Sequence, residues 1–296
     1  MVRQASWSAS ADFHRGPIEE PDRLSSPINP FSNLEENDMP FVTRDGVRLH
    51  WKLEGASSKP PIVLLNSIGT EMGMWDRAMP FMLENFLVLR TDARGHGASD
   101  ASPGDYGLLC LAGDVVAVMD AAGIEQAVIA GVSLGGMIAM ELALARPERV
   151  TGLALICTTA TTHAQMWSDR IQRVRTEGMA SIVETVMGRF LSPEFIETSP
   201  QYAETIRRSF LSTLPEGYAG CGAAIRDMAL VDRLGEIGAP ALVVIGTKDI
   251  STPLAGNGEL LLARIAGTKL AEVSGAHISP IEAPGEVAEV LADHFG

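Results

Sequence analysis

The most constraining feature of this sequence is the segment GVSLGG at residues 131–136. An apolar run at 127–130 leads directly into it, and the stretch 134–145 that follows has helical character. A serine between two glycines at a strand-to-helix turn is typical of a nucleophile held on a sharp, strained turn. The glycines leave room for the turn, and the helix N-terminus directs free N–H groups at the reacting centre. A turn that merely packs closely is the plain alternative, and the flanking strand and helix argue against it.

Short apolar runs alternate with segments of helical spacing along most of the remaining chain. The dipeptide Asp45-Gly46 between two such runs predicts a hairpin. The run PIVLL at 61–65 is typical of a strand buried on both faces. The pattern predicts an α/β fold, with a mostly parallel central sheet and helices on both faces. Strands are predicted at 41–43, 47–53, 61–65, 86–91, 127–130, 150–157, 241–245 and 269–273, and helices at 75–83, 108–122, 134–145, 254–265 and 284–295.

The alternation is interrupted once, and this interruption predicts the domain organisation. Residues 159–227 are helical in tone and contain no convincing buried strand, so we expect them to form an inserted helical cap. The α/β core then comprises 39–158 and 228–296. Residues 1–38 are rich in Ser, Pro, Asn and acidic residues and are predicted to be a flexible N-terminal extension. The alternative is that this extension packs on the core or mediates oligomer contacts.

Three residues in the order serine, acid, histidine form a candidate catalytic triad. A serine hydroxyl needs a base within hydrogen-bond reach, and the base needs an orienting partner. His277 directly follows the last predicted strand, whereas His294 lies in the final helix. Asp249 is the acid that follows the strand at 241–245. We therefore predict Ser133 as nucleophile, His277 as base and Asp249 as its partner, although each loop residue taken alone has a structural alternative.

The predicted oxyanion hole consists of two backbone N–H groups. Leu134 follows the nucleophile and supplies one, and Ile68, in the loop after the strand PIVLL, is our choice for the other. The segment DARGHG at 92–97 follows the next strand, and we expect it to tie loops together near the site. His96 in this segment is accordingly predicted to be structural rather than catalytic.

From about Met39 to the C-terminus the chain resembles the α/β-hydrolase family, and more narrowly the 3-oxoadipate enol-lactonases of aromatic catabolism (the β-ketoadipate route). The motif around Ser133 and the DARGHG segment are generic to the family, whereas NSIGT, the cap motif WxxR and YAGCGAAIRDM are more specific. Members commonly carry His-Gly where this chain has Asn66-Ser67, and a 38-residue extension is unusual among them. The resemblance rests on segments 66–76, 90–106, 131–137, 166–179, 217–228 and 276–284.

The resemblance implies an enol-lactone substrate with a free carboxylate arm. Such an anion requires a cation in the pocket, and the WxxR motif singles out Arg170, with Trp167 one helical turn before it. An ordinary place on the cap surface is the alternative for both residues. The implied reaction is attack by Ser133 on the lactone carbonyl, expulsion of an enolate, and hydrolysis of the acyl-enzyme by water that His277 activates.

Other activities remain open at this point. A carboxylesterase, a C–C bond hydrolase of ring-fission products or a cofactor-free perhydrolase of the same fold would use the same triad. A non-catalytic small-molecule receptor on this scaffold is a further alternative, which the intact triad disfavours. A haloalkane dehalogenase would need aspartate where Ser133 stands.

Composition restricts the partners. A formal net charge of −14 over 296 residues argues against a nucleic-acid surface but not against an anionic small molecule. No apolar run is long enough for a membrane span, and no secretory signal is evident, so we expect a cytoplasmic protein without membrane contact. Cys110, Cys157 and Cys221 are widely spaced and predicted to be reduced. We find no metal-ligand spacing or nucleotide motif and expect no metal or other cofactor. A homo-oligomer remains open.

Overall fold

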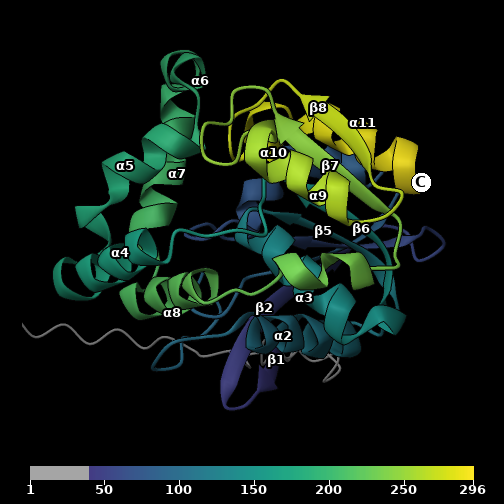
Figure 1. The fold of residues 1–296 in the computed structure, drawn as a ribbon, viewed down its shortest axis with the longest axis horizontal. Coiled ribbons are helices and arrows are strands. Elements are labelled where there is room, and N and C mark those ends of the chain that lie inside the picture. Colours follow the sequence, from purple (N-terminus) through teal and green to yellow (C-terminus); the bar gives the residue numbers. More distant parts are fainter. Residues whose placement is uncertain (1–39) are drawn as a thin grey trace, which may run out of the picture. The chain divides into compact units, whose positions relative to one another are not determined.

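The computed structural model describes residues 40–296, and the predicted extension 1–38 lies outside the described residues. Eight strands form one sheet in the order β1-β2-β4-β3-β5-β6-β7-β8 (Figure 1). The strands are β1 (Phe41–Arg44), β2 (Val47–Glu54), β3 (Pro61–Leu65), β4 (Leu87–Thr91), β5 (Ala127–Val132), β6 (Val150–Ile156), β7 (Ala241–Gly246) and β8 (Lys269–Val273).

The sheet is mostly parallel, as the alternating pattern predicts. Strands β3 to β8 pair in parallel, whereas β2 is antiparallel to both β1 and β4. The β1–β2 hairpin turns at Asp45 and Gly46, whose φ angles of 50° and 75° lie in the left-handed region that such a turn requires. Every residue of β5 and β7 is buried, because helices cover both faces of the sheet. The carboxyl ends of the parallel strands therefore meet at one edge.

Helices pack in pairs on the two faces of the sheet. Helices α2 (Leu108–Ala121) and α3 (Leu134–Ala145) contact each other, as do α1 (Met79–Met82) and α11 (Pro284–Phe295). Figure 1 shows α2 and α3 on one side of the sheet and α11 on the other. Within residues 40–296, no helix is long and apolar enough to cross a membrane.

A block of helices separates β6 from β7 in the sequence, where the insertion is expected. Helices α4 (Ala164–Glu177) and α8 (Pro215–Arg226) pack closely because α8 presents small residues to its partner. A Cβ added at Gly222 would lie 3.1 Å from Ile171 and 3.4 Å from Trp167 of α4. The block comprises α4 (Ala164–Glu177), α5 (Val183–Phe190), α6 (Pro193–Thr198), α7 (Pro200–Ser212) and α8 (Pro215–Arg226), and we call it the cap.

Two predicted helices are shorter than expected. The segment predicted as a helix at 75–83 contains only the end of a 3₁₀ turn, Met72–Trp75, and the short helix α1, which begins beside Pro80. The helix predicted at 254–265 begins only at Glu259, as α9 (Glu259–Arg264), because Gly256 has a φ of 78° and breaks the preceding turn. Both segments have the apolar spacing of a helix. Pro80 in the first and Gly256 in the second prevent one continuous helix from forming.

Candidate active site

Ser133 lies on a strained turn between β5 and α3. Its φ and ψ of 55° and −114° fall outside the ordinary regions for an L-residue. A Cβ at position 131 would lie only 2.1 Å from the backbone of Gly135, so the turn requires the glycine that stands there. The Ser133 N–H donates to the carbonyl of Ile156 at 3.0 Å, and the Thr158 hydroxyl donates to the Ser133 carbonyl at 2.6 Å. These contacts hold the residue in its strained conformation.

His277 and Asp249 lie together at the carboxyl ends of β8 and β7. The imidazole Nδ1 is 3.1 Å from Oδ2 of Asp249. The carboxylate also accepts the Ser251 N–H at 2.7 Å and the Thr252 hydroxyl at 2.6 Å. Burial of Asp249 acts to raise its pKa, but the hydrogen bonds it accepts, above all that from the imidazole, outweigh burial and leave the pKa below its ordinary value. Asp249 is therefore an ionised partner that orients the histidine.

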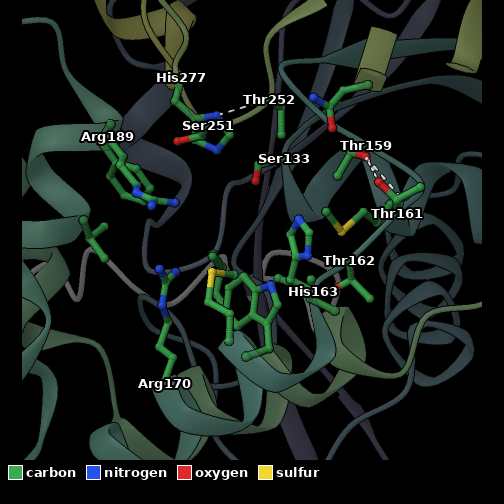
Figure 2. Close-up of a pocket in the computed structure, with 18 of the residues that line it drawn as sticks. Ser133, Thr159, Thr161, Thr162, His163, Arg170, Arg189, Ser251, Thr252 and His277 are labelled. Atoms are coloured by element: carbon green, nitrogen blue, oxygen red, sulfur yellow. Dashed lines mark hydrogen bonds between the residues drawn. The ribbon is translucent and has the colours of Figure 1, made fainter. Parts of the chain in front are cut away.

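Ser133 and His277 face the same cavity, as Figure 2 shows. No hydrogen bond joins them among residues 40–296, and in serine hydrolases this bond commonly tightens only when substrate binds. His277 is held from the cap side as well. Its ring stacks on Phe190 of α5 with centroids 5.9 Å apart, and the N–H of Ile278 donates to the Phe190 carbonyl at 3.2 Å.

Of the two predicted oxyanion donors, Leu134 directly follows Ser133 and Ile68 lines the same cavity. Leu134 is the first residue of α3, so its N–H has no acceptor in the preceding turn. Ile68 lines the cavity, and none of the hydrogen bonds within residues 40–296 uses its N–H. The loop that carries it is fixed by the side chain of Asn66, which donates to the Thr91 carbonyl at 2.9 Å and accepts the Trp75 indole N–H at 3.0 Å. This loop can present the Ile68 N–H to an oxyanion.

His96 is buried behind the same loop. Its Nε2 accepts the N–H of Gly69 at 2.9 Å, and its Nδ1 is 3.2 Å from the carbonyl of Arg94. A carbonyl accepts, so Nδ1 carries the proton and the ring is neutral. Burial, the largest influence, keeps the pKa of His96 below its ordinary value. His96 is thus structural, as expected, and supports the oxyanion loop.

The cavity above Ser133 has a volume of about 260 Å³ and is lined by both the core and the cap. Its walls carry cationic and apolar side chains, and no Asp or Glu is among the described lining residues. Arg170 and Arg189 enter it from different directions, and their ends point towards the same part of the cavity (Figure 2). The lining residues are Ile68, Ser133, Met137, Thr159, Thr161, Thr162, His163, Met166, Trp167, Arg170, Val186, Arg189, Phe190, Tyr218, Ile225, Ser251, Thr252, Asn257 and His277.

The cap residues singled out by the sequence both lie at this cavity. The guanidinium of Arg170 stacks over the ring of Trp167 at 4.7 Å. Arg175, in contrast, pairs with Asp105 at 2.7 Å and does not line the cavity. Neither Arg170 nor Arg189 has an ion-pair partner among the residues the structure describes. Both cations are available to an anionic ligand.

Sequence reasoning missed several residues of the site. Arg189 and Phe190 lie at the end of α5, and Tyr218 lies in α8. Tyr218 lies in YAGC, part of a segment that carries the enol-lactonase resemblance, and this resemblance could have pointed to it. Thr252 donates a hydrogen bond to Asp249, and no motif in the sequence indicated this contact. Within residues 40–296 no cluster of His, Cys, Asp and Glu could hold a metal ion.

Comparison with known proteins identifies the family of the chain. The model of a family described as alpha/beta hydrolase fold matches residues 60–284. A 3-oxoadipate enol-lactonase of Acinetobacter baylyi is 34% identical over 82% of this chain and 91% of its own length.

Two solved structures are also similar. An enol-lactonase from Burkholderia xenovorans has a TM-score of 0.83 and 34% identity, covering 86% of this chain and 99% of that one. A hydrolase from Pseudomonas aeruginosa has a TM-score of 0.83 and 38% identity, covering 86% and 97%. The chain therefore belongs to the α/β-hydrolase fold family, and it is a hydrolase.

Proposed function

We propose that this hydrolase opens an enol-lactone ring that carries a free carboxylate, as in 3-oxoadipate enol-lactone. The observation that carries the proposal is the cavity above Ser133, which contains Arg170 and Arg189 but no Asp or Glu among its described lining residues. Such a pocket suits an anionic acyl substrate. The similar proteins named as enol-lactonases support the same substrate class.

In the proposed first half-reaction, Ser133 Oγ attacks the lactone carbonyl while His277 takes its proton. Asp249 holds the imidazole through Nδ1, so that Nε2 is the nitrogen available to the serine. The N–H groups of Ile68 and Leu134 stabilise the oxyanion. Collapse of this intermediate breaks the ring C–O bond and releases an enolate in the same molecule, which takes the proton held by His277 and becomes the ketone, leaving His277 neutral.

In the second half-reaction, water attacks the acyl-enzyme. His277 takes a proton from the water and returns it to Ser133 Oγ, so the product leaves as a second carboxylate. The carboxylate arm lies against Arg170 and Trp167 throughout and fixes the ring above the serine. The cap restricts access of bulk water.

The proposal includes a cytoplasmic site of action in the catabolism of aromatic compounds. Cys110, Cys157 and Cys221 are free thiols, the state expected in a reducing compartment. Burial raises the pKa of Cys157 to about 12, which keeps this thiol protonated and unreactive.

A steady-state comparison tests the proposal. We expect kcat/KM for 3-oxoadipate enol-lactone to exceed that for p-nitrophenyl acetate and for a diketone ring-fission product. Turnover of the simple ester alone would instead identify a carboxylesterase, and turnover of the diketone alone a C–C hydrolase.

A serine variant tests the nucleophile. Ser133→Ala is expected to lower kcat for the lactone by roughly 10⁴-fold or more, because the remaining oxyanion donors cannot replace the nucleophile. Ser212→Ala, at the exposed end of α7, makes the same change away from the cavity and should leave kcat unchanged. Full turnover by Ser133→Ala would reject the proposed mechanism.

A further inference from the structure

A buried hydroxyl of the cap lacks an acceptor among residues 40–296. Tyr218, in helix α8, is fully buried and lines the cavity above Ser133. Its O–H finds no acceptor among the residues the structure describes, and the nearby Arg170 guanidinium is itself a donor. A buried polar group that the fold leaves unpaired costs free energy, and a ligand that pairs with it recovers that cost. The mechanism described above does not use this residue.

The ring of Tyr218 is fixed in place. It packs edge-on against Phe210, with centroids 5.7 Å apart. A Cβ added at Gly69 of the oxyanion loop would lie 3.2 Å from Cε2 of the tyrosine. The start of α8 is equally constrained, because a Cβ at Gly217 would lie 2.4 Å from the backbone of Gly95. The hydroxyl cannot swing away to find another partner, so its partner must come to it.

The environment of this hydroxyl selects the chemistry of that partner. Burial is the largest influence on the pKa of Tyr218 and raises it, while Arg170 acts to lower it through its positive charge and through a hydrogen bond to the phenol oxygen. The net direction is upward, so the phenol remains protonated and can donate. Arginine has only donors, so a contact with Arg170 leaves the phenol hydrogen without an acceptor. A cationic donor and a neutral donor thus converge at this wall of the cavity.

We propose that Tyr218 is a substrate-binding residue whose phenol O–H donates a hydrogen bond to the carboxylate that Arg170 binds. This proposal rests on the proposed function and extends it, because it names a second, neutral donor for the same anion. The oxyanion loop packs against the tyrosine ring beside its hydroxyl, so the loop that positions the scissile carbonyl also fixes the phenol. The subsite accordingly favours a lactone or ester with a carboxylate over a neutral one.

Titration calorimetry with adipate tests the subsite without any turnover. Adipate is a stable dicarboxylate and serves as the probe. Tyr218→Phe keeps the ring packing and removes only the hydroxyl, and it should weaken adipate binding about tenfold, the effect of one hydrogen bond to a charged acceptor. Tyr202→Phe makes the same change on α7 outside the cavity and should bind adipate like the unaltered protein. Equal affinity in Tyr218→Phe, or no adipate binding by the unaltered protein, would overturn the proposal.

A double variant tests whether both donors meet the same carboxylate. Arg170→Gln alone should weaken adipate binding more than Tyr218→Phe, because it removes a charge. Adding Tyr218→Phe to Arg170→Gln should then cost much less than it does alone, since the carboxylate no longer sits against the phenol. Fully additive effects would show that the hydroxyl does not share this anion and would count against the proposal.

Kinetics separates this proposal from the proposed function. With the enol-lactone as substrate, Tyr218→Phe should raise KM about tenfold and leave kcat nearly unchanged, since the lost contact is equal in ground and transition states. An unaltered KM, with the lactone still hydrolysed, removes the role of Tyr218 and leaves the proposed function standing. Adipate binding that depends on Tyr218, in a protein that does not hydrolyse the lactone, retains the subsite and removes the proposed function.

Discussion

Two hydrogen bonds at His96 join the oxyanion loop to the segment that follows β4. Its Nε2 can accept the Gly69 N–H only while the ring is neutral, because a protonated imidazole has two donors and no acceptor. Protonation of this one side chain would therefore place two N–H groups against each other beside the oxyanion donor Ile68. The fold prevents this by burying the ring, which holds the pKa of His96 below its ordinary value.

The first prediction concerns the pH dependence of stability. A histidine with a lowered folded-state pKa contributes stability that is complete above its unfolded pKa, roughly 6.5, and is lost as the pH falls towards the folded-state pKa. His96→Gln can accept the same N–H but does not titrate. Below pH 6.5 the unaltered protein should lose up to about 1.4 kcal/mol of unfolding free energy per pH unit relative to His96→Gln. Thermal melting followed by circular dichroism from pH 8 to pH 5 measures it, and parallel curves would contradict the prediction.

At the scale of elements, the cap is tied to the loop that carries the base. Ser192 begins α6 as its N-cap and accepts the Phe195 N–H at 3.2 Å. The same residue donates its N–H and its hydroxyl to the two oxygens of Glu282, at 2.6 and 2.8 Å. Glu282 ends α10 (Ser279–Glu282), directly after the loop of His277. Together with the stacking of Phe190 on His277, these bonds make cap position and base position interdependent.

The second prediction addresses this tie. In Glu282→Gln the side-chain NH₂ replaces one of the two oxygens that accept from Ser192. One hydrogen bond is lost, and we expect the free energy of unfolding to fall by about 1–2 kcal/mol. Hydrogen exchange measured by mass spectrometry should become faster in peptides that cover 183–199. Glu194→Gln is the matched control, because its ion pair with Lys248 at 2.6 Å is exposed and contributes little. Equal exchange in both variants would mean that the bonds between Ser192 and Glu282 do not hold the cap.

The sheet elements were predictable from sequence for a simple physical reason. Strands such as β3 and β7 are buried on both faces and are therefore continuous apolar runs. The candidate triad follows from them, because Asp249 and His277 stand just beyond the ends of β7 and β8. Arg189 and Tyr218 could not be found in this way. The face that a cap helix turns towards the cavity depends on tertiary packing, and periodicity alone does not identify which polar residue on that face meets a ligand.

At the scale of the whole molecule, charge is unevenly distributed. The chain has a formal net charge of −14, yet the cavity is lined by Arg170 and Arg189 and by no acidic residue among those described. The carboxylate of the triad, Asp249, lies behind the imidazole and is compensated by hydrogen bonds. The local field in the cavity is therefore opposite in sign to that of the molecule, which favours an anionic ligand at this place only.

The cap and the core also share one hydrophobic interior. Buried residues of α5 and α7, such as Val183 and Phe210, belong to the same cluster as those of the central strands. Residues 39–296 accordingly form one compact unit, although the cap is a separate insertion in the sequence. An insertion that shares its core with the parent sheet should not unfold by itself.

The third prediction is a single unfolding transition for this unit. Far-UV circular dichroism and tryptophan fluorescence should melt together, and the calorimetric and van't Hoff enthalpies should agree. Ile182→Ala removes a buried cap side chain that does not line the cavity, at a cost of about 2–5 kcal/mol. It should lower the midpoint of every probe together by roughly 5–15 °C. Ile250→Ala, at a side chain that is 72% exposed, should leave the midpoint nearly unchanged. A separate early transition in Ile182→Ala would show instead that the cap unfolds independently of the sheet.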